Sequence, residues 1–537
     1  MGELILPPES DTGNIEYKYK LDNLNNLAIQ KKMSQLQYRM NEGNGEAIYY
    51  IGVYNNGKID GLSEEDWQES IKNLELISSK IGATIINVNT ITLKNGKKYS
   101  EFIIREYSED TYLDLKIGVI GNVDSGKSSL VGVLTKGVAD NGRGSARSLV
   151  FNFKHEVESG RTSSIGHQIA GFNKNGEIIN CKKNGLPLKW NEITKEATKI
   201  VTFYDLAGHE KYLRTTIYGL SSSYPDYCLV IAGANLGISH MTREHIGLCL
   251  ALKIPFIVII TKIDLAPEDI LQETVRRINQ MCKNGARKIP YNIKTKDDVL
   301  TVSKNIKSDT IVPIIQLSSV TLENMDLLKL LLNLLPMRND YSQFINQHIE
   351  LLIDSHFYIT GHGTVVSGLL TSGTIKINDS VLVGPTLNGE YLPTKIKSIH
   401  IKHSDVKEGK AGIYISVNIK NIQRKMIRKG MVIIGENAEK KLIREFWVKI
   451  VLFQSHSTTI SVGYEPYIHI AQVRQISKIL KIEKINDSDD NQILRTGDRA
   501  FIKLRFNKCA EYIKTDMNLV FRDGKVKAFG VIVPDRD

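Results

Sequence analysis

LKIGVIGNVDSGKSSLVGVLTKG, residues 115–137, combines an apolar strand pattern, a glycine-rich loop and a helical pattern. Its centre, residues 121–128, fits the motif G-x-x-x-x-G-K-[S/T]. Glycines let such a loop curl until successive backbone N–H groups point at a phosphate at the helix N-terminus. A chance glycine-rich turn is the alternative, but the preceding strand and following helix favour a phosphate-binding loop. Its expected residues are Gly121, Asn122, Val123, Asp124, Ser125, Gly126, Lys127, Ser128 and Ser129.

Two side chains at the end of this loop indicate its chemistry. A lysine in the position of Lys127 can reach the β- and γ-phosphates of a nucleoside triphosphate, and the hydroxyl of Ser128 can ligate Mg²⁺. The loop alone therefore predicts a nucleoside triphosphate and a magnesium ion, without selecting the base.

From residue 112 to about residue 338, near-continuous apolar segments alternate with helical patterns. This alternation predicts an α/β domain with a mostly parallel sheet and helices on both faces. The expected strands are LDLKIGVIG (113–121), KIVTFYDLAG (199–208), YCLVIAGA (227–234), IPFIVIITKID (254–264) and TIVPIIQLSS (310–319).

The motif DLAGH, residues 205–209, directly follows one of these strands. A carboxylate at the end of a neighbouring parallel strand can face the magnesium ion, usually through water. A glycine N–H can reach a γ-phosphate, because no side chain blocks the approach. Asp205 and Gly208 are therefore expected at the phosphate site.

The motif TKID, residues 261–264, follows another strand and concerns the base. An aspartate there can accept hydrogen bonds from both N1–H and N2–H₂ of guanine, a pair of donors that adenine lacks. Asp264 therefore predicts GTP and disfavours a P-loop ATPase or kinase, while Thr261 and Lys262 border the base. Ser318 and Ser319 follow the next strand and are suited to closing over the base edge. All these elements lie at strand C-terminal ends, where α/β sheets bind ligands.

The remainder of the 537-residue chain predicts a multidomain protein. Residues 1–45 are polar and predict a loosely ordered arm or short helices, and residues 46–111 show a strand–helix–strand–strand pattern of a small α+β domain. After residue 338, short strands recur about every ten residues with Gly-Asn-Asp turns, which predicts antiparallel β-barrels. The expected domains are 1–45, 46–111, 112–338, 345–438 (first barrel) and 441–537 (second barrel).

The composition indicates which partners, cysteine chemistry and compartment to expect. The net charge of +11 favours an acidic partner such as nucleic acid, and a lysine-rich bias of the whole genome explains it equally well. The five cysteines form no C-x-x-C pair, which argues against a zinc knuckle and a disulfide framework. The N-terminus lacks a signal-peptide pattern, and the apolar runs are too short to span a bilayer. A cytoplasmic protein without a membrane segment is expected.

Together these motifs resemble translational GTPases of the elongation factor Tu/elongation factor 1-alpha class. Residues 140–166, DNGRGSARSLVFNFKHEVESGRTSSIG, are similar to the first switch region of its GTP-binding protein 1 and 2 subgroup. The segment GHGTVVSGLLTSGTIKINDSVLVGP resembles the second domain of the class, and LRTGDRAFIKLRF the third. The resemblance implies a GTPase domain followed by two barrels, a monomer, and hydrolysis of GTP to GDP with Mg²⁺.

Further roles follow from the resemblance only. It implies that His209 positions the attacking water, with Val123 and Ile165 as apolar neighbours unless they are ordinary packing residues. In the first switch it implies that Ser164 meets Mg²⁺, with Thr162 as the alternative.

The sequence also departs from the class. Thr261 stands where the class has Asn, which removes an amide that braces the base pocket, and Ser319 stands where Ala is usual. The segment at 172–192, with its two Asn-Gly turns, resembles an inserted hairpin.

The resemblance implies the ribosome and aminoacyl-tRNA as partners. Basic segments at 396–410 and 421–430 fit a phosphate-facing surface, or equally a solvated lysine-rich face. The rival interpretation is a GTP-regulated RNA-binding adaptor of mRNA decay that does not depend on the ribosome.

Overall fold

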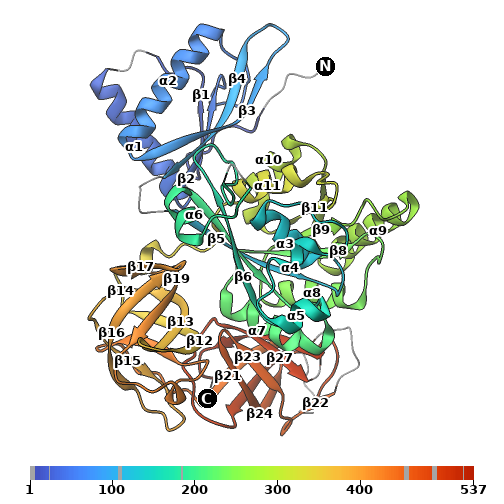
Figure 1. Ribbon diagram of the computed structural model, residues 1–537, viewed down its shortest axis with the longest axis vertical. Coiled ribbons are helices and arrows are strands. Elements are labelled where there is room, and N and C mark those ends of the chain that lie inside the picture. Colours follow the sequence, from blue (N-terminus) through green and yellow to red (C-terminus); the bar gives the residue numbers. More distant parts are fainter. Residues whose placement is uncertain are drawn as a thin grey trace.

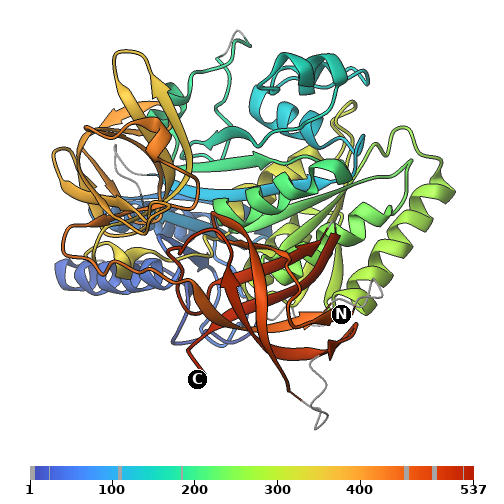
Figure 2. The same cartoon turned by 90° about the horizontal axis from the view of Figure 1, so that it is seen from below.

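The structure, a computed structural model, describes residues 6–22, 25–106, 112–182, 185–452, 459–485, 493–523 and 525–536. Figure 1 shows an N-terminal region at one end of the long axis, an α/β domain in the centre, and two β domains at the other end. Seen from below in Figure 2, the two β domains lie beside each other. The boundary predicted at residue 111 and Asn184 of the second Asn-Gly turn lie outside the described residues.

The central domain contains a seven-stranded sheet in the order β10-β11-β9-β8-β5-β7-β6. Neighbouring strands are parallel except β6 and β7. The predicted mostly parallel sheet is confirmed, and the two edge strands, β6 and β10, are additional to the strands predicted. The strands are β5 (Leu113–Gly121), β6 (Gly166–Phe172), β7 (Lys199–Asp205), β8 (Tyr227–Gly233), β9 (Phe256–Thr261), β10 (Ile289–Ile293) and β11 (Ile311–Gln316).

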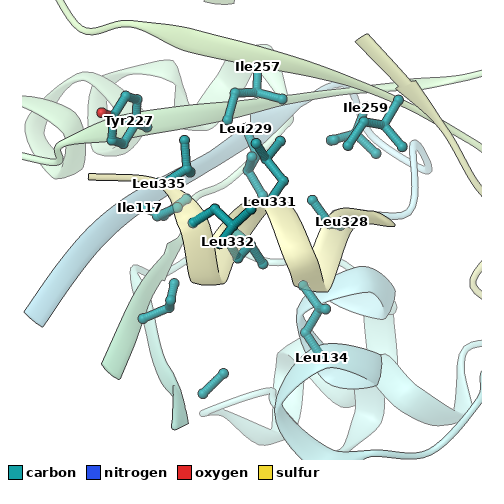
Figure 3. Close-up of a cluster of buried hydrophobic side chains, with 14 of the residues drawn as sticks. Ile117, Leu134, Tyr227, Leu229, Ile257, Ile259, Leu328, Leu331, Leu332 and Leu335 are labelled. Atoms are coloured by element: carbon teal, nitrogen blue, oxygen red, sulfur yellow. The ribbon is translucent and has the colours of Figure 1, made fainter. Parts of the chain in front are cut away.

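Helices cover both faces of this sheet because its strands are apolar on both sides. In β8, Leu229 enters one core and Val230 the other, as alternating side chains must. Figure 3 shows Leu331 and Leu332 of the last helix, α11, in the first core with Ile117 of β5. The helices are α3 (Lys127–Lys136), α4 (Ser145–Ser148), α5 (Lys154–Ser159), α6 (Trp190–Glu196), α7 (Leu213–Ser223), α8 (His240–Ala251), α9 (Glu268–Gln280), α10 (Lys296–Asn305) and α11 (Met325–Leu334), with short turns η1 (Glu210–Tyr212), η2 (Met281–Gly285) and η3 (Ile306–Ser308).

The N-terminal region is a four-stranded sheet in the order β1-β2-β4-β3, with two helices whose side chains share one core with it. Residues 15–42 belong to this fold, so the loosely ordered arm is wrong there, whereas the alternative of a short helix agrees with the structure. The helix is hard to see in the sequence because few of its residues are buried: Leu36 and Met40 lie one turn apart in the core, and Arg39 pairs with the buried Glu16 at 2.7 Å. The elements are β1 (Ile15–Lys18), α1 (Asn26–Glu42), β2 (Glu46–Ile51), α2 (Glu64–Lys80), β3 (Ala83–Thr92) and β4 (Lys98–Glu106).

A buried cluster of charges joins the N-terminal region to the central domain. Arg105 of β4 is fully buried, and its Nε donates to Glu46 at 2.7 Å. The buried Lys199 of β7 lies 3.8 Å from the same carboxylate and donates to the carbonyl oxygens of Asn333 and Leu335. Burial lowers the pKa of Lys199 to about 7. The two regions therefore share an interior, and Glu46 supplies a negative charge to both cations.

Two β domains follow. In the first, β15-β20-β12-β13-β19-β16 form a ring, because β15 pairs with both β20 and β16. The second is a closed barrel of β21-β26-β24-β23-β27-β28, which confirms the predicted antiparallel architecture. The remaining elements are η4 (Ser342–Phe344), β12 (Glu350–Ile359), β13 (Gly363–Ser372), β14 (Thr374–Lys376), β15 (Ser380–Gly384), β16 (Leu392–Ile401), β17 (Ser404–Val406), β18 (Glu408–Lys410), β19 (Tyr414–Ile419), η5 (Arg424–Met426), β20 (Val432–Gly435), β21 (Glu445–Leu452), β22 (Ile460–Ser461), β23 (Tyr467–Ile470), β24 (Val473–Lys484), β25 (Ile493–Leu494), β26 (Arg499–Phe506), β27 (Asn518–Asp523) and β28 (Lys525–Val533).

Helix α7 connects the central domain to both β domains. The Tyr218 hydroxyl donates to the carbonyl oxygen of Asp354 at 2.9 Å, and the Ser221 hydroxyl donates to that of Ala471 at 2.8 Å. Because α7 closely follows the DLAGH motif, a shift of that motif can reach both β domains. Within the described residues, every helix is too short or too polar to cross a bilayer.

Candidate nucleotide-binding site

The loop between β5 and α3 encloses a cavity of about 210 Å³ at the C-terminal end of the central sheet. Gly126 adopts a left-handed conformation, with φ of 86°, directly before the first residue of α3. At Gly121 a Cβ atom would overlap the carbonyl oxygen of Ile231, so only glycine permits this approach of β5 to β8. The loop therefore has the curled backbone that the motif predicts.

Lys127 lies at the bottom of this cavity, with only 7% of its surface exposed. Its Nζ donates to the carbonyl oxygen of Asn122 at 2.7 Å. Burial lowers the pKa of Lys127 to about 8. A Cβ atom on Gly208 would overlap this ammonium group, so a glycine in DLAGH keeps the space open beside the lysine. The site therefore holds a desolvated cation that a phosphate would neutralise.

A cluster of oxygen atoms lies next to Lys127. The Ser128 hydroxyl donates to Oδ2 of Asp205 at 2.6 Å and lies 2.7 Å from the hydroxyl of Thr162. Oδ1 of Asp205 is buried and has no hydrogen-bond partner among the described residues. Burial raises the pKa of Asp205 to about 6. A carboxylate with a spare oxygen, next to the Ser128 hydroxyl and with the Thr162 hydroxyl close by, fits Mg²⁺, which prefers hard oxygen ligands and retains several waters.

The structure places Thr162, not Ser164, beside Ser128. The hydroxyl and backbone N–H of Ser164 both donate to Glu156, at 3.0 and 2.9 Å. The buried Glu156 also accepts the N–H of Ser163 and of Asn152. These hydrogen bonds lower the pKa of Glu156 against the opposing effect of burial. In this conformation the predicted metal ligand Ser164 is held away, and the alternative, Thr162, occupies its place.

His209 lines the same cavity, as does Val123. Its Nδ1 accepts the N–H of Lys211 at 3.1 Å, which begins the turn η1 and leaves Nε2 as the free end of the ring. Ile165 does not line this cavity and instead approaches Gly219 of α7. The structure therefore brings His209 and Val123 to the phosphate site, and Ile165 to the neighbouring helix.

The base side of the site contains the residues after β9 and β11. The Thr261 hydroxyl donates to the carbonyl oxygen of Ser125 at 2.6 Å. A threonine thus braces the phosphate loop where the class uses an asparagine. Lys262 lines the cavity, Asp264 two residues on is exposed, and Ser318 accepts two backbone N–H groups of its own turn, at 3.1 and 3.0 Å.

Ser319 connects this base-side turn to the first switch region. Its carbonyl oxygen accepts the N–H of Asp140 at 2.9 Å. Its side chain therefore takes no part in that contact, so the change from the alanine usual in the class leaves it intact.

The first switch region contributes lining residues that the motifs do not single out. They come from one segment rich in Gly and Arg, and its resemblance to the first switch of the class was the signal for the segment, although it did not single out these residues. They are Asp140, Gly142, Arg143, Gly144, Arg147, Gly160 and Arg161.

The pKa of Lys127 predicts how nucleotide affinity depends on pH. A phosphate binds the ammonium form, and this form is lost in the free protein as pH rises through about 8, so binding then requires proton uptake. The affinity for GDP without added Mg²⁺ is expected to fall about fivefold between pH 8 and pH 9, and less than about twofold between pH 7 and pH 8. Titrations with fluorescent GDP measure this. Lys127→Gln should bind weakly and lose the pH dependence, and a flat wild-type profile would contradict the prediction.

Comparisons with known proteins agree with this geometry. The model of the elongation factor Tu GTP binding domain matches residues 114–337, and that of elongation factor Tu domain 2 matches residues 363–434. GTP-binding protein 1 of Xenopus laevis is 42% identical over 502 residues, 93% of this chain and 75% of that protein. GTP-binding protein 2 of Homo sapiens is 40% identical over 535 residues, 98% of this chain and 87% of that protein.

A solved structure shows the same fold at lower identity. Translation elongation factor SelB from Methanococcus maripaludis, in complex with the GTP analogue GppNHp, superposes with a TM-score of 0.56 and 18% identity. The match covers 79% of this chain and 80% of that one. With the phosphate loop, DLAGH and TKID in place around one cavity, this chain belongs to the elongation factor Tu class of translational GTPases and is a GTP-binding protein.

Proposed function

We propose that this chain hydrolyses GTP to GDP and phosphate as a conformational switch, and that it acts on the ribosome with aminoacyl-tRNA. The observation that carries the proposal is that the phosphate loop and DLAGH, two segments far apart in the chain, meet at one cavity: Lys127 and His209 line it, and Asp205 accepts a hydrogen bond from the lining residue Ser128 at 2.6 Å. In phosphoryl transfer most of the catalysis is positioning and charge neutralisation, and these side chains are suited to both.

Each residue has a defined part in this proposal. Lys127 and the loop N–H groups hold the β- and γ-phosphates, and Asp264 selects guanine. Ser128 and Asp205 would hold Mg²⁺. Bound there, Mg²⁺ would neutralise charge on the phosphate oxygens. His209 orients the attacking water through Nε2, because its Nδ1 already accepts a hydrogen bond.

The first switch supplies the conformational change. Thr162 is beside Ser128 in this structure, and Ser164 is held by Glu156. We expect one of these hydroxyls to join Ser128 when GTP is bound, and the switch to relax once the γ-phosphate leaves. Helix α7 would carry the change to the β domains through Tyr218 and Ser221.

A large cavity supports the proposal that this protein binds RNA. It measures about 1290 Å³ where the central domain meets both β domains, and its lining includes Trp190, His403, Lys429 and Arg474. Of the two basic segments, Lys402 is buried against Asp114 at 3.2 Å and Arg428 pairs with Glu511 at 2.7 Å. Those two cations belong to the interior, and the exposed lysines around them remain available to RNA.

The test is GTP turnover with and without ribosomes charged with aminoacyl-tRNA. Ribosomes should stimulate the wild type, and His209→Ala should lose about 100-fold or more of the stimulated rate while retaining GTP binding. His348→Ala, at an exposed histidine outside the site, is the matched control. Absence of ribosomal stimulation would count against the translational role.

The same experiment distinguishes the ribosomal role from the alternative, a GTP-regulated RNA-binding adaptor of mRNA decay. That role would show GTP-dependent RNA binding without ribosomal stimulation. Deletion of residues 1–111 is not a clean test, because it would remove Glu46 and Arg105 from a shared interior. We expect a monomer that acts in the cytoplasm in either case.

A further inference from the structure

We infer that Arg147, on α4, contacts the phosphate chain of GTP and neutralises charge in the transition state of hydrolysis, as an arginine supplied from within the chain. The inference rests on the proposed hydrolysis of GTP. Arg147 lines the phosphate cavity together with Lys127, Ser128 and His209.

The position of Arg147 is set by a well-anchored helix. Ala146 is buried, and its carbonyl oxygen lies so close to α3 that a Cβ atom on Gly132 would overlap it. The carboxylate of Asp140 accepts the N–H of Ala146 at 2.9 Å. The N–H of Asp140 in turn donates to the Ser319 carbonyl oxygen at 2.9 Å. Helix α4 is thus fixed to both the phosphate-loop helix and the base-side turn.

Two glycines give the guanidinium its space. A Cβ atom on Gly144, with φ of 92°, would overlap Nε of Arg147, and one on Gly160, with φ of 65°, would lie 3.0 Å from its Nη2. Both glycines belong to the first switch, one on each side of α5. Side chains at these positions would displace the guanidinium from the edge of the cavity.

The donors of Arg147 are almost unused. Its nearest charge is the carboxylate of Asp124 in the phosphate loop, 3.9 Å from Nη1, and the side chains are 33% and 58% exposed. An ion pair this exposed contributes little free energy. Among the described residues the guanidinium makes no hydrogen bond, so its five donors can turn to phosphate oxygens without breaking one. Arg143 and Arg161 also line the cavity, but both are exposed and make no ion pair with the residues that the structure describes.

The proposed step conserves atoms and electrons. The water oxygen forms a bond to the γ-phosphorus while the bond from that phosphorus to the β–γ bridging oxygen breaks. The electron pair stays on GDP, and the protons of the water leave with inorganic phosphate and solvent. Arg147 donates hydrogen bonds to phosphate oxygens as negative charge moves toward the bridge, which is what an arginine finger does.

The experiment measures single-turnover GTP hydrolysis on ribosomes, the dissociation constant for GDP, and binding of GDP with aluminium fluoride. Arg147→Ala should slow hydrolysis by about 100-fold or more and lose the aluminium fluoride complex, with GDP affinity within about threefold of wild type. Arg147→Lys should recover only part of the rate, since lysine lacks the planar fork. Arg276→Ala, at an exposed arginine of α9, is the control.

The glycines provide a second test if Arg147→Ala does not fold. Gly144→Ala should slow hydrolysis by displacing the guanidinium, whereas Gly185→Ala, with φ of 80° and no atom within 4 Å, carries the same backbone strain outside the site. A rate for Arg147→Ala within threefold of wild type would overturn the inference and leave the proposed function standing. An equal loss of rate and GDP affinity would make Arg147 a binding anchor and overturn its catalytic role. A wild type that hydrolyses no GTP would overturn both.

Discussion

Replacing Asp264 with Asn should lower the affinity for GTP by about 100-fold or more. The carboxylate is expected to accept two charge-assisted hydrogen bonds from guanine, each contributing about 1.5–3 kcal/mol. An asparagine amide can accept only one of the two and presents an N–H₂ group to the other donor. Competition between GTP, ATP and xanthosine triphosphate for fluorescent GDP measures the change, and xanthosine triphosphate, whose 2-oxo group can accept from the amide, should become the preferred ligand.

The control for Asp264→Asn is Asp269→Asn, which removes an acidic group in the first turn of α9. It should leave the ratio of GTP to ATP affinity unchanged. If Asp264→Asn also leaves that ratio unchanged, guanine is not recognised through TKID. Equal affinity of the wild type for ATP and GTP would restore the P-loop ATPase or kinase interpretation.

Glu46→Gln should destabilise the protein by about 3–5 kcal/mol, because it leaves two buried cations without their shared counter-charge. Arg105 and Lys199 are both fully buried, and the Glu46 carboxylate lies 2.7 Å from one and 3.8 Å from the other. The central domain and the N-terminal region should unfold together at a lower urea concentration than in the wild type, since the cluster joins them.

Two further variants show whether uncompensated charge is the cause. Glu75→Gln, at an exposed position of α2, should change stability by less than about 0.5 kcal/mol. Glu46→Gln combined with Lys199→Met removes one of the unpaired cations and should recover part of the loss. A midpoint for Glu46→Gln no lower than that of Glu75→Gln would show that the cluster does not hold the two regions together.

The first switch shows where sequence reasoning was incomplete. Alignment with the class pattern selects Ser164 as the metal ligand, but a hydroxyl side chain carries no information about the carboxylate that binds it. The structure shows Ser164 on Glu156 and Thr162 beside Ser128. Arg147 was invisible for a similar reason, because its importance depends on glycines 3 residues before it and 13 after it that make room for its guanidinium.

The N-terminal region shows the same limit in predicting the fold from the sequence. The strand–helix–strand–strand pattern after residue 46 was visible because β2 and β4 are almost wholly buried, and because Ser63 and the acidic residues after it mark the start of α2. The sequence left a short helix open in this region but did not place α1 in the core, because α1 buries few of its residues and its Arg39 is compensated by Glu9 and Glu16, which lie outside the helix. A charged residue looks solvent-exposed until its partner is known.

The sequence by itself determined the class of the protein: an α/β domain that binds GTP, followed by antiparallel β domains. Local patterns suffice for this, because the phosphate loop, DLAGH and TKID each act through residues a few positions apart at the end of one strand. Only the tertiary structure decided which switch hydroxyl lies beside Ser128, which arginines line the phosphate cavity, and that the N-terminal region shares its interior with the central domain. These facts depend on pairs of side chains that lie far apart in the chain, and whether two such groups meet is set by packing of the whole molecule.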